Sequence, residues 1–416
     1  MNKTFGLIGY PLGHSFSPKI HNLLGDYEYR LFPLQEEEVG HFLRCGEFQG
    51  LNVTIPYKKT VMGYCAELSD VARRIGCVNT LLRREDGSLY GHNTDYEGLV
   101  YALRRAELTL AWEKVLVLGS GGSSLTARVV AQDMGAESVV VISRTGEDNY
   151  ENLYRHRDAG IIINTSPVGM YPDNGRSLVN LEDFPKCKGV CDLVYNPAYT
   201  KLLLDARGLG IPHVGGLPML VAQAVAASEL FQGKRLERSV IEKILQRIAQ
   251  ETKNILIIGM PGSGKTTIGR VLAEKLNRPF VDTDQMIFEE EGRSIPEIFA
   301  QDGEEAFRAL EHRALERVSK ESGVVISVGG GAVTREENHD LVRQNSQVIF
   351  LERELAQLET MGRPLSKKKS LEQIYEERIG LYQVLSQYTV ENQVVEQTAE
   401  DIIKRLKLRR SADQRM

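Results

Sequence analysis

The feature that most constrains this chain is a glycine-rich loop near its middle, Gly259–Thr266, with the sequence GMPGSGKT. It directly follows the apolar run Ile255–Ile258 and precedes a helical pattern from Thr267 to Leu276. A G-x-x-x-x-G-K-[ST] loop between a strand and a helix is typical of sites that hold the phosphates of a nucleoside triphosphate. Its glycines let backbone N–H groups surround phosphate oxygens, while its lysine meets the outer phosphates and its hydroxyl ligates Mg²⁺. Such a loop normally opens its domain, so the residues before it are predicted to form a separate unit.

Length and charge limit the remaining possibilities. The 416 residues exceed what one hydrophobic core usually serves, which predicts two or three domains. The net charge of -5, with acidic and basic residues interspersed, argues against a nucleic-acid or membrane partner. The apolar runs are only of strand length and residues 1–20 do not resemble a signal peptide, so we expect a cytoplasmic protein. The sequence leaves the oligomeric state open.

Strand-like apolar runs alternate with helical patterns along the whole chain. This rhythm predicts an α/β fold with parallel sheets flanked by helices. A fresh strand–turn–helix begins at Val115, which splits the first part near residue 100. A helical pattern over 218–250 is expected to close the first part, and the polar segment 250–254 is expected to act as a short hinge. The predicted domains are therefore 1–100, 101–250 and 253–410.

A second glycine loop points to a dinucleotide. Gly119, Gly121 and Gly122 follow a strand and open a helical stretch, so their backbone donors can face a pyrophosphate. Arg144 follows the next strand, where a basic residue suits the 2′-phosphate of NADP and an acidic one suits the free hydroxyl of NAD. The acidic residues that follow it, Glu147-Asp148, weaken the electrostatic case for NADP without reversing it. A surface arginine without a ligand is the alternative.

The first part resembles shikimate dehydrogenase over residues 1–245. The resemblance is carried by an ordered series of motifs: Ser15–Pro18, Asn52–Lys58, Gly76–Thr80, Gly91–Asp95, Asn164–Met170, Asp192–Pro197 and Gly215–Ala224. It implies an α/β substrate subdomain followed by a Rossmann-like NADP subdomain. It also implies a group of substrate-binding residues that carry hydroxyl or amide groups: Ser15, Ser17, Thr54, Asn79, Tyr195 and Gln223.

The same resemblance makes Lys58 and Asp95 the catalytic pair. Hydride transfer between a nicotinamide and a ring carbonyl requires a proton to be delivered to, or taken from, the same oxygen. An ammonium can stabilise the developing charge on that oxygen and move the proton, while a carboxylate orients and tunes the ammonium.

The last part resembles shikimate kinase over residues 253–410 and so implies a P-loop kinase domain. The matching segments follow the phosphate loop in order: Phe280–Asp284, Gly303–Arg308 with Glu311, Gly329–Gly331, Gly362–Leu365 and Arg378–Tyr382. We expect Asp282 and Asp284 to occupy same-face positions at the end of one strand, because side chains alternate along a strand.

The kinase resemblance assigns roles to these residues. Lys265, Asp284 and Arg363 are expected to be catalytic, with Arg363 on a mobile lid. Arg308, Gly330 and Arg378 are expected to bind the substrate, since the planar fork of arginine suits a carboxylate. The alternatives are an Arg308 that only pairs with Glu304 or Glu311, and a glycine triplet that only forms a tight turn. Thr266 and Asp282 are expected to hold Mg²⁺. The expected ATP-binding residues are Gly259, Gly262, Gly264, Lys265, Thr266 and Thr267.

Together the two resemblances imply one bifunctional enzyme. It would reduce 3-dehydroshikimate to shikimate with NADPH and then phosphorylate shikimate with ATP. Two alternatives keep the folds: activity on related substrates, such as quinate with NAD or another small polyol, and a silent half that serves as a sensing module.

Overall fold

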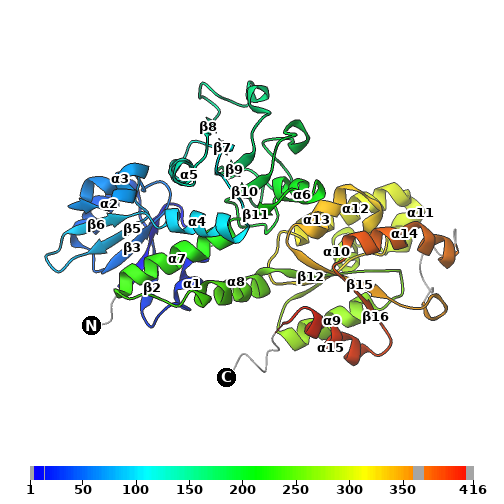
Figure 1. Ribbon diagram of the computed structural model, residues 1–416. Coiled ribbons are helices and arrows are strands. Elements are labelled where there is room, and N and C mark those ends of the chain that lie inside the picture. Colours follow the sequence, from blue (N-terminus) through cyan, green and yellow to red (C-terminus); the bar gives the residue numbers. More distant parts are fainter. Residues whose placement is uncertain (1–3, 14, 359–369, 409–416) are drawn as a thin grey trace. The chain divides into compact units, whose positions relative to one another are not determined.

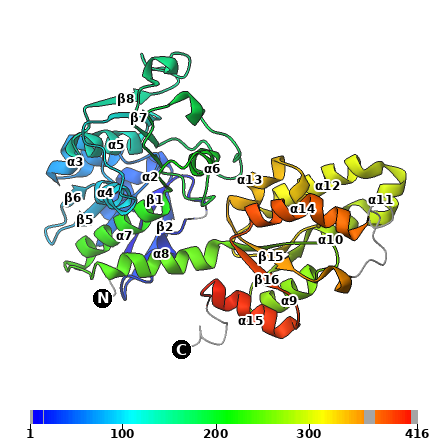
Figure 2. The ribbon, with the colours of Figure 1, turned by 45° about the vertical axis from the view of Figure 1, so that its right-hand side comes forward.

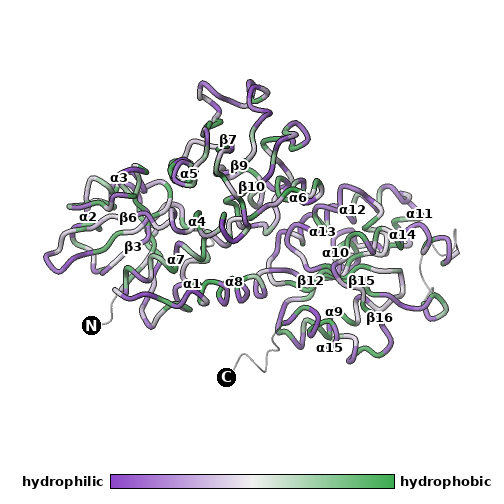
Figure 3. The backbone as a smooth tube through the Cα atoms, in the orientation of Figure 1, coloured by the Kyte–Doolittle hydropathy of each residue, from purple (hydrophilic) through white to green (hydrophobic). Residues whose placement is uncertain are grey.

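The computed structural model describes residues 4–13, 15–358 and 370–408, and its chain divides into two compact units, Met1–Arg247 and Ile248–Met416 (Figure 1). Each unit is α/β in class. Figure 3 shows hydrophobic and hydrophilic segments interspersed along both units. Among the helices of the described ranges, none is both long enough and apolar enough to cross a bilayer.

The first unit begins with a six-stranded sheet in the order β2-β1-β3-β5-β6-β4. Its elements are β1 (Thr4–Gly9), α1 (Ser17–His21), β2 (Glu28–Pro33), α2 (Glu36–Cys45), β3 (Gly50–Val53), β4 (Glu67–Leu68), α3 (Asp70–Ile75), β5 (Thr80–Arg83), β6 (Leu89–His92) and α4 (Asp95–Arg105).

This sheet is mixed, so the expectation of parallel sheets holds for only part of it. Strand β5 runs antiparallel to both β3 and β6. The reason lies in the connection from β5 to β6, a turn of a few residues in which Gly87 has φ 84°. A turn this short can join only antiparallel neighbours, because a parallel pair needs a long crossover.

The second sheet of this unit is fully parallel, in the order β11-β10-β9-β7-β8. Its residues alternate between two cores: Val115 and Val117 face α5, whereas Leu116 and Leu118 face α6. Its elements are β7 (Lys114–Leu118), α5 (Gly122–Asp133), β8 (Ser138–Ile142), β9 (Ile161–Asn164), β10 (Gly189–Asp192), α6 (Lys201–Gly208) and β11 (His213–Val214).

The helical pattern expected over 218–250 is two helices, α7 (Leu217–Gln232) and α8 (Ser239–Thr252). Gly233, at φ 64°, ends α7 in the left-handed conformation that favours glycine. Helix α7 packs against α4. The expected hinge is not a loop, because α8 continues to Thr252 and Asn254 already begins the next strand.

The second unit is a parallel sheet in the order β13-β14-β12-β15-β16. Figures 1 and 2 show α9 and α15 on one face of it and α12, α13 and α14 on the other. The elements are β12 (Asn254–Ile258), α9 (Lys265–Leu276), β13 (Phe280–Asp282), α10 (Thr283–Glu291), α11 (Ile295–Gln301), α12 (Gly303–Val318), β14 (Val325–Ser327), α13 (Glu337–Arg343), β15 (Ser346–Glu352), α14 (Leu371–Leu385), β16 (Tyr388–Glu391) and α15 (Val395–Arg405).

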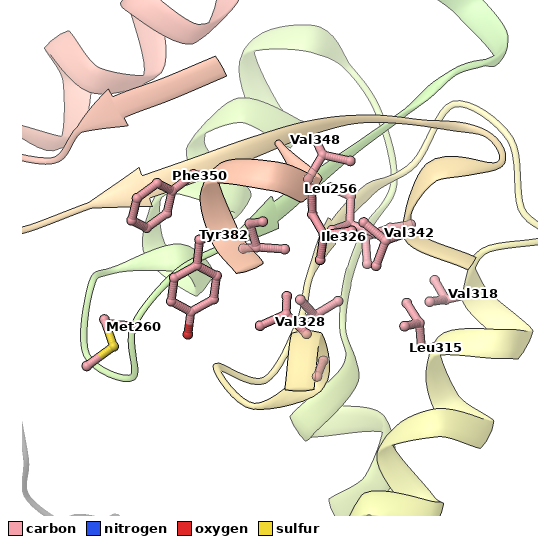
Figure 4. Packing of buried hydrophobic residues seen from close by; sticks show 14 of the residues in the cluster. Leu256, Met260, Leu315, Val318, Ile326, Val328, Val342, Val348, Phe350 and Tyr382 are labelled. Carbon is pink, nitrogen blue, oxygen red and sulfur yellow. The ribbon is translucent and has the colours of Figure 1, made fainter. Parts of the chain in front are cut away.

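The two faces of this sheet carry separate cores. Leu256, Ile326 and Phe350 point to one face with Tyr382 of α14 (Figure 4), whereas Ile255, Ile257 and their neighbours point to the other. This alternation follows from the two-residue period of a strand. A sheet buried on both faces holds its strand ends rigidly, which matters because the phosphate loop leaves from one of them.

We predict that Ile326→Ala destabilises the second unit by about 2–5 kcal/mol, because it leaves a cavity beside a fully buried strand. Hydrogen exchange read by mass spectrometry should show faster exchange in peptides from β12 and β14. Peptides from β7 and β9 in the first unit should be unchanged. Equal acceleration in both units would show that the two units unfold together.

Candidate active sites

A cavity of about 470 Å³ opens in the first unit between its two sheets. Its lining includes every residue predicted to bind or act on substrate in this unit: Ser15, Ser17, Thr54, Lys58, Asn79, Asp95, Tyr195 and Gln223. Ser123 and Met170 also line it, although the sequence did not single them out. The structure therefore brings the predicted residues together, while their individual roles stay predictions.

These residues converge because they follow strand ends or begin helices. Thr54 and Lys58 lie after the carboxyl end of β3, and Ser17 begins α1 beyond β1. Asp95 is the first residue of α4, and Gln223 lies on α7, which packs against α4. The carboxyl ends of parallel strands meet at one edge of a sheet, which is where α/β proteins place their ligands.

Lys58 and Asp95 form a buried ion pair at the cavity wall. The ammonium of Lys58 donates to Oδ2 of Asp95 at 2.6 Å, and the side chains are 16% and 9% exposed. Burial lowers the pKa of Lys58, but the charge and hydrogen bond of Asp95 outweigh it, so the net pKa is raised. Lys58 is thus held as a protonated acid beside the cavity.

The dinucleotide loop adjoins this pair. Gly119 has φ 109°, and a Cβ there would lie 3.0 Å from Oγ1 of Thr165, so the turn requires glycine. A Cβ on Gly121 would meet nothing within 4 Å, and one on Gly122 would meet only Cδ of Lys58, at 3.5 Å. The open space over the N-terminus of α5 fits a pyrophosphate, and its nearest neighbour is the predicted catalytic lysine.

At the predicted ribose site, the structure shows the position of Arg144 and a contact of the nearby acid Asp148. Arg144 is exposed just beyond β8. The carboxylate of Asp148 lies 2.9 Å from Nε2 of His156, a buried side chain. Asp148 is therefore held within its own loop by this contact.

In the second unit the phosphate loop has the backbone that its sequence demands. Gly259, Gly262 and Gly264 have φ values of 148°, 86° and 93°. The ammonium of Lys265 donates to the carbonyl groups of Gly259 and Met260, at 3.0 and 2.9 Å, so it lies inside the loop. Thr267 follows in the first turn of α9. Glycines with positive φ and a helix N-terminus fit a bound polyphosphate.

The expected same-face placement of Asp282 and Asp284 is wrong. Strand β13 ends at Asp282, and Asp284 lies in the first turn of α10. Asp282 is the N-cap: its Oδ1 accepts from the backbone N–H groups of Asp284 and Gln285. Its Oδ2 accepts from the hydroxyl of Thr266 at 2.7 Å, so the two predicted magnesium ligands are adjacent. A hydroxyl and a carboxylate fit Mg²⁺, which takes its remaining ligands from water and phosphate.

The predicted carboxylate-binding residues are buried around the glycine triplet. Nη1 of Arg308 donates to Oε2 of Glu311 at 2.6 Å, and a Cβ on Gly331 would fall 2.2 Å from the Arg308 guanidinium. Arg378 is 4% exposed, and its Nε and Nη1 have no hydrogen-bond partner among the described residues. A buried cation with unsatisfied donors indicates a site for an anion.

Glu311, which the sequence offered only as a possible ion-pair partner of Arg308, and Tyr382, which it gave no role, also belong to this site. Burial raises the pKa of Glu311 against the lowering effect of Arg308 and Arg378, and a Cβ on Gly329 would meet Glu311 Oε1 at 2.2 Å. The hydroxyl of Tyr382 donates to the carbonyl of Gly330 at 2.6 Å, so it fixes the turn that presents Gly330. Their only sequence signal was helical spacing from the arginines. Arg363 lies outside the described residues.

The folds and sites define a two-part enzyme, a dinucleotide-dependent oxidoreductase joined to a P-loop kinase. Residues 7–81 match the family model of the shikimate dehydrogenase substrate binding domain, and residues 261–407 match that of shikimate kinase. A shikimate dehydrogenase (NADP(+)) of Clostridium perfringens is 38% identical over 267 residues, which span 59% of this chain and 98% of that relative. The chain thus belongs to the shikimate dehydrogenase family, and both predicted resemblances are confirmed.

Solved structures agree with this assignment. A chorismate mutase/shikimate 5-dehydrogenase fusion protein from Clostridium acetobutylicum has a TM-score of 0.57 and 35% identity, covering 60% of this chain and 97% of that one. Shikimate 5-dehydrogenase from Thermus thermophilus, in complex with NADP(H) and shikimate, has a TM-score of 0.54 and 31% identity, covering 59% and 99%. Both matches lie within the α/β class expected from the sequence.

We predict that Asp95→Asn moves the alkaline limb of the dehydrogenase kcat/KM profile to lower pH by about one to three units. Asp95 is the main group that raises the pKa of Lys58, and without its charge the burial of Lys58, which lowers that pKa, is expected to dominate. Lys58 would then lose its proton at a lower pH. The test is the pH dependence of kcat/KM for the variant, measured from its residual activity across the alkaline range. If the alkaline limb does not move, a group other than Lys58 must cause it.

Proposed function

We propose that the first unit reduces 3-dehydroshikimate to shikimate with NADPH. The observation that carries this is the buried Lys58–Asp95 pair in the wall of a cavity lined by hydroxyl and amide groups. Such groups suit a hydroxylated ring acid, because a substrate lacking the matching hydroxyls would leave buried donors unpaired. The similarity to the NADP(+)-dependent shikimate dehydrogenase of Clostridium perfringens supports NADP as the cofactor.

The chain supplies the acid–base chemistry of this step. A dinucleotide held at its pyrophosphate by the loop at Gly121 and Gly122 would supply a hydride from its nicotinamide to the ring carbonyl carbon. Lys58 then donates a proton to the carbonyl oxygen, which becomes the hydroxyl of the product, and regains a proton from water. Asp95 keeps the lysine charged and aimed at that oxygen.

We propose that the second unit transfers the γ-phosphoryl group of ATP to the 3-hydroxyl of shikimate. Arg308 and Arg378 would hold the substrate carboxylate, and Asp284 would orient the hydroxyl and accept its proton. Lys265 would neutralise the outer phosphates, with Mg²⁺ held near Thr266 and Asp282. The unsatisfied donors of buried Arg378 are the main support for an anionic substrate.

The two proposals reinforce each other, because the product of the first reaction is the acceptor of the second. A coupled assay with 3-dehydroshikimate, NADPH, ATP and Mg²⁺ tests both. It should show oxidation of the cofactor followed by shikimate 3-phosphate. Parallel reactions with quinate and NAD⁺ and with other polyols should be slower; a faster reaction with any of them would replace the proposed substrate.

We predict that Lys58→Ala lowers the rate of reduction by about 10²–10⁴-fold and leaves phosphorylation unchanged, because it removes the proton donor of one unit only. Asp284→Asn should do the reverse. Both activities are measured on each purified variant. Loss of both activities in either variant would show that the units are not independent.

We also predict that Gly331→Ala raises the KM for shikimate in the kinase reaction by about tenfold or more, because its Cβ would displace the Arg308 guanidinium. The backbone of Gly331 has φ -97°, so the effect would come from this contact and not from backbone strain. The matched control is Gly380→Ala in α14, where a Cβ meets nothing within 4 Å. It should leave KM unchanged; an equal rise in both variants would contradict the contact.

A further inference from the structure

Behind the cavity wall, a row of buried polar side chains crosses the first sheet of the first unit. The hydroxyl of Tyr29 on β2 donates to Oδ1 of Asn52 on β3, at 2.8 Å. Nδ2 of Asn52 donates to Oγ1 of Thr80 on β5, at 3.2 Å, and these two residues are opposite partners in the β3–β5 register. Their exposed fractions are 8%, 6% and 0%.

The row continues to the catalytic pair. Oγ1 of Thr80 donates to Oδ1 of Asn79 at 2.9 Å, and Nδ2 of Asn79 donates to Oδ1 of Asp95 at 2.9 Å. The other oxygen of Asp95 accepts from Lys58 at 2.6 Å. An unbroken series of hydrogen bonds therefore joins Tyr29, a buried residue on the edge strand β2, to Lys58, at the cavity.

The direction of these bonds follows from a single backbone group. The N–H of Thr94 can only donate, and it lies 2.7 Å from Oδ1 of Asn79, which fixes the orientation of that amide. The hydroxyl of Thr80 then donates to the same oxygen at 2.9 Å, a shorter contact than the 3.2 Å to Oγ1 of Thr94, and its lone pairs are left for the NH₂ group of Asn52. The oxygen of Asn52 therefore faces Tyr29, which donates. Every bond in the series points toward Asp95, and aligned bonds of this kind polarise and strengthen one another.

In this arrangement the two carboxylate oxygens of Asp95 have different partners. With Oδ1 engaged by Asn79, Asp95 presents Oδ2 to Lys58. Lys58 has three N–H donors, so two remain for the substrate oxygen. A rotated Asp95 would change both the pKa and the aim of the lysine, which are the two properties the reaction needs.

A second feature holds the far end of the series. The ring of Tyr29 stacks on His21, with centroids 3.9 Å apart and an interplanar angle of 8°. Burial lowers the pKa of His21 to about 3. The imidazole is therefore uncharged at neutral pH, and its Nδ1 lies 2.7 Å from the hydroxyl of Tyr27.

We propose that Tyr29 and Thr80 are positioning residues of the dehydrogenase. Neither is among the residues that line the described cavity, and each acts through an amide that leads to Asp95. The proposal rests on the proposed catalytic role of Lys58 and Asp95. The competing explanation is that these hydroxyls only satisfy buried polar groups and so affect stability alone.

The test uses the full chain and two near-isosteric substitutions, Tyr29→Phe and Thr80→Val. We expect kcat for reduction to fall about fivefold in Tyr29→Phe and about tenfold in Thr80→Val, with both KM values within about twofold of the unchanged chain. The double variant should lose no more than about tenfold, because the two hydroxyls act in series. Thr80→Ser, which keeps the hydroxyl, should restore kcat and keeps the proposal testable if Thr80→Val does not fold.

The matched control is Tyr57→Phe, which also removes a buried tyrosine hydroxyl from this subdomain. That hydroxyl donates to the carbonyl of Leu34 at 2.6 Å, away from the series, although Tyr57 is the neighbour of Lys58 in the chain. The control should lower the melting temperature by a similar amount and leave kcat within about twofold. The kinase activity of each preparation, which these substitutions should not change, serves as the measure of enzyme concentration.

Two results would overturn the proposal. The first is an unchanged kcat in both Tyr29→Phe and Thr80→Val, with a loss of stability like that of the control. The second is a fall of about fiftyfold in the kcat of the double variant, which is the product of the two single effects. A parallel Lys58→Ala variant separates this from the proposed function. If Lys58→Ala keeps its activity, the catalytic assignment itself fails. If it is inactive while Tyr29→Phe and Thr80→Val are normal, only the positioning role fails.

Discussion

Both sites depend on one constraint, which is that the carboxyl ends of parallel strands meet at one edge of a sheet. In the first unit this edge carries Thr54 and Lys58 after β3 and the glycine loop after β7. In the second it carries the phosphate loop after β12 and Asp282 at the end of β13. The sheets are buried on both faces by helices, so these edges are rigid. Loops of very different sequence can then present chemistry at a defined place.

Charges are buried at both edges, and each unit stabilises them differently. In the first unit the buried charge is internally paired, since Lys58 and Asp95 face each other and the carboxylate accepts a further bond from Asn79. In the second unit Arg308 is paired with Glu311, while Arg378 keeps donors that the described residues do not satisfy. A paired site suits proton transfer at an unchanged total charge. A site with excess positive charge suits an anionic substrate and a transferring phosphoryl group.

Much of the fold was predictable because strand and helix periods are local properties. The runs at Lys114, Ile161 and Ile255 became strands, and Gly119, Gly259, Gly262 and Gly264 of the two glycine loops took positive φ values. The failures were also physical. Strand β5 is antiparallel because the turn that joins it to β6 is short. The segment predicted as a hinge, 250–254, contains the end of α8. Asp284 lies in a helix and not in the predicted strand, because β13 ends at Asp282, which caps α10. In each case the local sequence was compatible with two structures, and contacts with other parts of the fold decided between them.

By itself the sequence determined which chemical groups the protein has and the order in which strands and loops present them, because residue type and backbone preference are encoded locally. Together with the family resemblances it predicted Lys58, Asp95, Lys265, Arg308 and Arg378 as site residues. Only the tertiary structure decided how buried polar groups share their hydrogen bonds. Asn52, Thr80 and Asn79 form a directed series to Asp95 because β3 and β5 pair in one register. Register is a property of the assembled sheet, so no single segment could reveal it.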